Sequence, residues 1–127
     1  MFLRVLDIKK TLKRKSLFLL GPRMSGKTTY LKRNFKEAHF INLLKPELFL
    51  RYKTQPELFG KEIEFEIVIN KKSVFVVDEI QKIPALLDEV HNLIEEYTDI
   101  RFILTGSSAR KLKRSGVNLL GGRASRY

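Results

Sequence analysis

The sequence predicts an α/β fold, a three-layer sandwich built around a mostly parallel sheet of about four strands. Short apolar runs alternate along the chain with segments of helical periodicity, an order typical of parallel strands joined by helices. The run at 74–77, Val-Phe-Val-Val, is continuous and β-branched, as expected of a strand buried on both faces. A glycine-rich loop follows the apolar run at 17–20 and precedes a segment that can start a helix, 28–35.

The first half of the chain is expected to alternate between helices and strands. Residues 2–14 suit a short amphipathic helix, and residues 17–20 suit the first strand. After the glycine loop we expect a helix that ends near Phe35, followed by a second strand at 39–43. Two further helices are expected on either side of Gln55-Pro56, at 46–53 and 57–69.

The second half continues the alternation. A turn at 70–72 leads to a third strand at 73–77. Pro84 suits the first turn of the next helix, whose apolar stripe is Ile83, Leu87, Val90, Ile94 and Tyr97. A fourth strand is expected at 101–104, and the chain from Ser107 onward is interpreted as helix or loop ending in irregular structure. No segment is a candidate for a fifth strand or a helical lid.

Length and composition predict one domain spanning residues 1–127. The absence of cysteine excludes disulfides and thiolate metal sites and suits a cytoplasmic protein. His39 and His91 lie far apart in the sequence, so both are interpreted as packing or surface residues. The sequence contains no apolar run of about 18 residues, the length that predicts a membrane helix, and no signal peptide is evident.

The net charge of +11 is unevenly distributed. Residues 1–36 hold eleven Lys or Arg and one acid, residues 37–100 hold seven basic and thirteen acidic residues, and residues 101–127 hold seven basic residues and no acid. Basic ends suit a phosphate-rich partner such as nucleic acid. Attraction of a nucleotide and an ordinary lysine-rich surface explain the same charge, so a nucleic-acid partner stays open.

The loop after the first strand matches the G-x-x-x-x-G-K-[ST] pattern that binds nucleotide phosphates. Its backbone N–H groups would surround the phosphate chain, and its two glycines permit a close approach. Lys27 would reach the β- and γ-phosphates, and Thr28 would offer its hydroxyl to Mg²⁺. An ordinary Gly/Ser turn is the alternative. The candidate ATP-binding residues are Gly21, Pro22, Arg23, Met24, Ser25, Gly26, Lys27, Thr28 and Thr29.

Two acids, Asp78 and Glu79, end the third strand. The carboxyl edge of a parallel sheet is where such folds bind ligands, so Asp78 could bind Mg²⁺ together with Thr28. Glu79 could orient the attacking water or accept its proton. A strand followed by a solvated helix start is the alternative for this pair taken alone.

The fourth strand leads into small hydroxyl residues, Thr105, Ser107 and Ser108. One of these side chains could sense the γ-phosphate or position the water, while a serine helix cap is the alternative. A GTPase is disfavoured because an Asn-Lys-x-Asp motif is absent. The Asp-Glu pair favours hydrolysis of ATP, although the loop alone does not exclude a small-metabolite kinase.

Taken together, these motifs resemble the AAA-type ATPases of bacteria and archaea that carry an uncharacterised C-terminal domain. The resemblance rests on four segments in order: 21–29, 78–84, 104–109 and 120–124. It implies Lys27 on the phosphates, Thr28 and Asp78 on Mg²⁺, Glu79 as the catalytic glutamate and Ser107 or a neighbour as the sensor. It also implies that Arg123 acts as an arginine finger across a subunit interface.

Members of that family look longer than this chain, so we expect a partial ATPase core whose fifth strand, lid and C-terminal domain are absent. The first strand would then lie at an exposed edge of the sheet. The expected activity is Mg²⁺-dependent ATP hydrolysis, with a second copy or a missing C-terminal piece as partner. The alternative is a non-catalytic fragment that binds nucleotide or nucleic acid.

Overall fold

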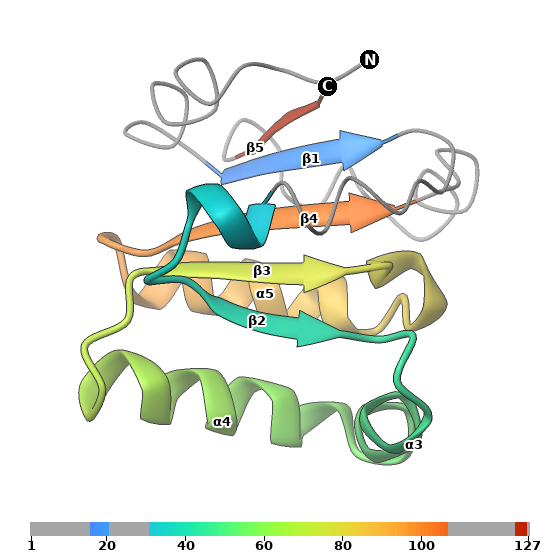
Figure 1. The fold of residues 1–127 in the computed structure, drawn as a ribbon. Helices are drawn as coiled ribbons and strands as arrows, with labels where there is room; N and C mark the ends of the chain where they lie inside the picture. Colours follow the sequence, from blue (N-terminus) through green and yellow to red (C-terminus); the bar gives the residue numbers. More distant parts are fainter. Residues whose placement is uncertain (1–15, 21–30, 107–123, 127) are drawn as a thin grey trace.

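The computed structural model describes residues 16–20, 31–106 and 124–126, and it shows an α/β fold with one parallel sheet (Figure 1). Five strands form this sheet in the order β2-β3-β4-β1-β5. The strands are β1 (Ser16–Leu20), β2 (His39–Asn42), β3 (Val74–Asp78), β4 (Arg101–Gly106) and β5 (Ala124–Arg126). All four pairings between neighbouring strands are parallel. The predicted α/β class and parallel sheet are confirmed.

The expectation that a fifth strand is missing is wrong. Ala124–Arg126 pairs in parallel with β1, with Ser16 opposite Ala124 and Phe18 opposite Arg126. β1 therefore lies between β4 and β5 and not at an edge of the sheet. A strand of three residues is too short to show an alternating apolar pattern in the sequence. Its pairing depends on backbone hydrogen bonds, which the side-chain pattern does not reveal.

The helices that follow β2 and precede β4 in the sequence cover one face of the sheet. They are α3 (Pro46–Thr54), α4 (Pro56–Val68) and α5 (Leu86–Glu96), and a short 3₁₀ helix, η1 (Ile80–Lys82), precedes α5. Their apolar side chains join those of alternate strand residues in the larger core cluster. Phe75 and Val77 of β3 and Phe102 and Leu104 of β4 face this cluster.

The opposite face of the sheet packs against the helical residues 31–34 and the chain that follows them. Leu31 and Phe35 form a second core cluster with Val76 of β3 and Ile103 of β4. Successive residues of β3 and β4 thus enter different clusters, so both strands are buried on both faces. The predicted three layers and the helix end near Phe35 are confirmed.

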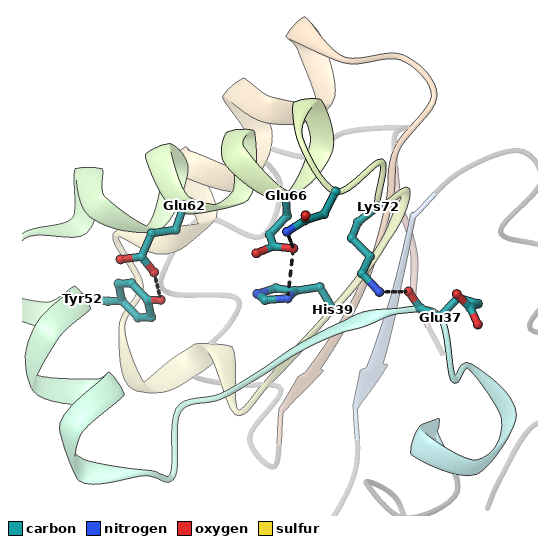
Figure 2. Close-up of polar contacts among 7 residues, drawn as sticks. Glu37, His39, Tyr52, Glu62, Glu66 and Lys72 are labelled. Carbon is teal, nitrogen blue, oxygen red and sulfur yellow. Dashed lines mark hydrogen bonds and ion pairs between the residues drawn. The ribbon is translucent and has the colours of Figure 1, made fainter.

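Polar contacts tie the second strand to the helices beside it (Figure 2). His39 at the start of β2 lies 3.8 Å from Glu66 of α4. Tyr52 of α3 is buried and donates its hydroxyl hydrogen to Glu62 of α4 at 2.5 Å. The ammonium group of Lys72 donates to the backbone carbonyl of Glu37 at 3.0 Å, which joins the two chain segments that lead into β2 and β3.

Several predicted boundaries differ from the observed ones. β4 extends to Gly106, so Thr105 lies within the strand. β3 ends on Asp78, one residue beyond the predicted end. α5 begins at Leu86, two residues after Pro84, because a bend at Ile83 and a turn at 84–85 occupy the start of the predicted helix. Ile83 is therefore not on the helix, although it is buried in the same core cluster.

Within the described ranges, no helix has the length and apolar character needed to span a membrane.

Candidate functional site

The carboxyl ends of β1, β3 and β4 meet at one edge of the sheet because these strands are parallel (Figure 1). Thr105 of β4 lies opposite Leu19 of β1. Leu104 lies opposite Val77 of β3, so the next residues, Thr105 and Asp78, are also level. Leu20 ends β1, and Gly21, the first residue of the predicted phosphate loop, follows it in the sequence. β1 therefore ends at the same edge of the sheet as Asp78 and Thr105.

A cluster of buried polar side chains occupies this edge. Asp78, Glu79, Gln81 and Thr105 are all less than a tenth exposed, and they are the buried polar or charged residues of the part of the chain that the structure describes. Buried carboxylates are costly unless hydrogen bonds or charges compensate them. Their concentration in one place, at the ligand-binding edge of the fold, marks this cluster as the candidate site.

The hydroxyl of Thr105 connects the two acids. It donates its hydrogen to Oδ1 of Asp78 in a short hydrogen bond and accepts the backbone N–H of Glu79 at 3.1 Å. A threonine hydroxyl has a single hydrogen to donate. Because that hydrogen is engaged with Asp78, a bond from Thr105 to a phosphate oxygen would require breaking the contact. The hydroxyl of Thr105 therefore links the end of β4 to the end of β3.

Glu79 has an unusual backbone conformation. Its φ of 61° and ψ of 48° lie in the left-handed region, where a residue with a Cβ atom is strained. Such strain persists where surrounding contacts fix it, and it is concentrated at functional sites. Here the Thr105 hydroxyl holds the backbone N–H of Glu79. The turn also redirects the chain from β3 into η1 directly after Asp78.

The side chain of Glu79 is held as well. The amide nitrogen Nε2 of Gln81 donates to Oε1 of Glu79 at 2.6 Å, with both side chains buried. Gln81 is not among the site residues predicted from the sequence. One signal was available, because Gln81 is a polar residue between the apolar Ile80 and Ile83. The left-handed turn that brings its side chain to Glu79 has no signature in the sequence.

The oxygen donors at this edge fit a hard cation. Mg²⁺ in nucleotide sites takes one or two carboxylates, with waters and phosphate oxygens completing its shell. Asp78 supplies one carboxylate at the end of β3. Within the described ranges, no group of three or more His, Cys, Asp or Glu residues is arranged to hold a metal. A single carboxylate leaves positions for the waters and phosphate oxygens that complete the shell of Mg²⁺ in a nucleotide complex.

Of the predicted site residues, Asp78, Glu79 and Thr105 lie in the described part of the chain, and the structure brings these three together. The other predicted site residues lie outside it, at positions 21–29, 107, 108 and 123. Their roles stay predictions from the sequence.

Residues 13–127 match the family described as AAA domain. The Cell division cycle protein 48 homolog of Archaeoglobus fulgidus is 35% identical over 83 residues, a match that covers 64% of this chain. The same match covers 11% of that protein, so the chain spans a small part of this relative's length.

Two solved structures share the fold. The structure of Drosophila ORC bound to DNA matches with a TM-score of 0.60 and 14% identity, over 97% of this chain and 85% of that one. The structure of C. elegans PCH-2 matches with a TM-score of 0.54 and 16% identity, over 93% of this chain and 35% of that one. At these identities the likeness concerns the fold alone.

Proposed function

Because the chain belongs to the AAA domain family, we propose that it binds ATP together with Mg²⁺ and hydrolyses the bound nucleotide. One observation supports this most: the buried Asp78, Thr105 and Glu79 constellation lies beside the end of β1. The glycine loop begins directly after that strand in the sequence. A phosphate cradle, a metal-binding carboxylate and a carboxylate for water would then share one sheet edge.

The phosphate loop supplies binding. We assign Lys27 to the β- and γ-phosphates and the loop residues 21–29 to the phosphate cradle, as the sequence pattern indicates. Thr28 and Asp78 would hold Mg²⁺, which neutralises charge that develops on the phosphate oxygens. Asp78 is held in place by Thr105, so its carboxylate is oriented before nucleotide arrives.

Glu79 is the proposed catalytic base or water-orienting group. It immediately follows the metal-binding candidate, and its side chain is 2% exposed. A carboxylate in this position can orient a water toward the γ-phosphate and accept its proton. Thr105 is better suited to positioning than to sensing, because its hydrogen is donated to Asp78. Ser107 therefore becomes the preferred candidate for the sensor, and Arg123 for an arginine finger supplied by a second copy.

A second candidate function is binding without turnover, to nucleotide or to nucleic acid. The basic ends of the chain favour it, and the ORC structure that shares the fold is bound to DNA. Phosphate contacts make such binding strongly salt-dependent. A titration of duplex DNA at rising salt tests it: a steep loss of affinity supports a nucleic-acid partner, and no binding at low salt removes it. A C-terminal piece or a second copy of the chain remains the proposed protein partner.

Nucleotide binding is tested with a fluorescent ATP analogue and Mg²⁺. Lys27→Ala should weaken binding by about ten- to a hundredfold, because it removes a charge-assisted bond to phosphate. Lys32→Ala is the matched control, since Lys32 is exposed on the helical segment beyond the loop. Equal affinity of the wild type and Lys27→Ala would contradict the assigned phosphate loop.

A further inference from the structure

We propose that Gln81 is a positioning residue that holds the carboxylate of Glu79 in its hydrolytic orientation. This inference rests on the proposed function, because it assigns a role that acts through Glu79. It adds a second residue to the water-activating part of the site, one that the sequence motifs alone do not identify.

The contact between the two side chains is short and shielded from solvent. Nε2 of Gln81 lies 2.6 Å from Oε1 of Glu79, and the exposed fractions of the two residues are 6% and 2%. A hydrogen bond to a carboxylate is stronger than one between neutral groups, and a low-dielectric surrounding strengthens it further. The bond therefore restricts the rotamers of Glu79.

The backbone around this pair is fixed as well. Gln81 lies within η1, two residues after Glu79 in the sequence. The carbonyl of Glu79 accepts the N–H of Lys82 at 3.1 Å. Ile80 and Ile83 on either side of Gln81 are buried in the larger core cluster. Because Thr105 holds the N–H of Glu79, the glutamate is fixed at its backbone by β4 and at its carboxylate by η1.

The chemistry of an amide suits this role. A carboxylate has about four lone-pair sites, and the bond from Gln81 occupies one of them. The amide donates a hydrogen bond without carrying a charge and does not titrate in the physiological range. It can orient Glu79 without competing for the proton that leaves the water. A glutamate at position 81 would place a second carboxylate against the first and offer no donor when ionised.

The test compares steady-state ATP hydrolysis by the wild type and Gln81→Met, a substitution of similar length that removes the donor. We expect kcat to fall about ten- to a hundredfold, the range for a misplaced catalytic group, with KM and the affinity for the ATP analogue unchanged. Gln55→Met is the matched control, because Gln55 is exposed and makes no side-chain cap bond. Thermal unfolding monitors the fold. If Gln81→Met does not fold, Gln81→Asn replaces it, with the same loss expected, because the shorter side chain keeps a polar amide but withdraws the donor from Glu79.

A double variant separates positioning from a general structural effect. In the Glu79→Gln background, Gln81→Met should cause no further loss of the residual turnover, because its effect acts through the Glu79 carboxylate. A further loss there, or wild-type kcat in Gln81→Met beside an inactive Glu79→Gln, overturns the positioning role and leaves the proposed function intact. Turnover by Glu79→Gln at the wild-type rate overturns the assignment of Glu79 and the positioning role with it. No turnover by the wild type overturns the hydrolytic function and the positioning role together.

Discussion

The side-chain oxygen of Thr105 lies 3.1 Å from the backbone nitrogen of Glu79, so a residue inside β4 fixes the residue that follows β3. The same hydroxyl donates to Asp78. One threonine therefore contacts both the carboxylate that ends β3 and the backbone of the residue that follows it. The fold and the candidate site depend on the same contact, which makes it accessible to measurements of both stability and activity.

Replacing Thr105 with valine should reduce both stability and turnover. Valine keeps the shape but leaves the Glu79 N–H and the Asp78 carboxylate without their hydroxyl partner in a buried place. The expected loss is about 1–3 kcal/mol in the free energy of unfolding, the range for a buried polar group that loses its partner. Urea unfolding measures it, and ATP hydrolysis should fall in parallel.

The controls for this prediction are Thr105→Ser, which keeps the hydroxyl, and Thr54→Val, which makes the same change at an exposed position. Both should retain turnover. A Thr105→Val protein with the stability and kcat of the wild type would show that the contact has no role.

Lys71 offers a test of backbone strain away from the site. Its φ is 57°, and it is exposed in the turn between α4 and β3. Lys71→Gly should raise the free energy of unfolding by roughly 1 kcal/mol, because glycine adopts left-handed angles without the Cβ clash. Lys72→Gly should instead lower it, since Lys72 has no such angle and its ammonium group bonds to Glu37. A loss of stability in Lys71→Gly equal to that in Lys72→Gly would contradict this explanation.

The raised pKa of Glu89 predicts that this residue makes the free energy of unfolding depend on pH. It lines an acidic groove between α4 and α5, and burial raises its pKa from the ordinary value of 4.5, with the Glu57 and Asp88 charges adding to the rise. The folded state then binds the proton more tightly than the unfolded state does. The resulting stability is present below pH 4.5 and is lost as the pH rises through the folded pKa.

Glu89→Gln removes this titration. The free energy of unfolding of the variant minus that of the wild type should therefore increase as the pH rises. The substitution should favour the folded state more at neutral pH than in acid. Urea unfolding of both proteins across that range measures the difference. Glu57→Gln removes one cause of the raised pKa and should change the wild-type profile in the same direction. A Glu89→Gln difference that does not vary with pH would contradict the prediction.

Much of the fold could be predicted from sequence because the strongest patterns belong to buried strands. The β-branched run of β3 and the apolar run of β4 predicted elements that enter both core clusters. β5 could not be predicted, since its three residues show no apolar pattern and their place depends on the free edge of β1. The start of α5 was misplaced because Pro84 suits a first helical turn but lies here in the turn before the helix.

The candidate site also has a part that could be predicted from the sequence and a part that could not. The position of Asp78 at a sheet edge follows from strand periodicity, so the sequence indicated it. The left-handed turn at Glu79 and the bond from Gln81 depend on contacts across elements, with Thr105 coming from a strand that lies 26 residues further along the chain. Sequence spacing does not specify such contacts, and only the folded arrangement reveals them.

The most direct test of the central proposal is single-turnover hydrolysis of Mg²⁺-bound ATP by the wild type and Glu79→Gln, with binding of the ATP analogue measured on the same samples. Glu47→Gln, the same change at an exposed helical position, is the control. We predict that Glu79→Gln binds nucleotide as tightly as the wild type and loses hydrolysis by at least about a hundredfold, the lower part of the range for general base catalysis. Equal, measurable hydrolysis in the two proteins would contradict the assignment of Glu79, and no hydrolysis by the wild type would contradict the proposed function.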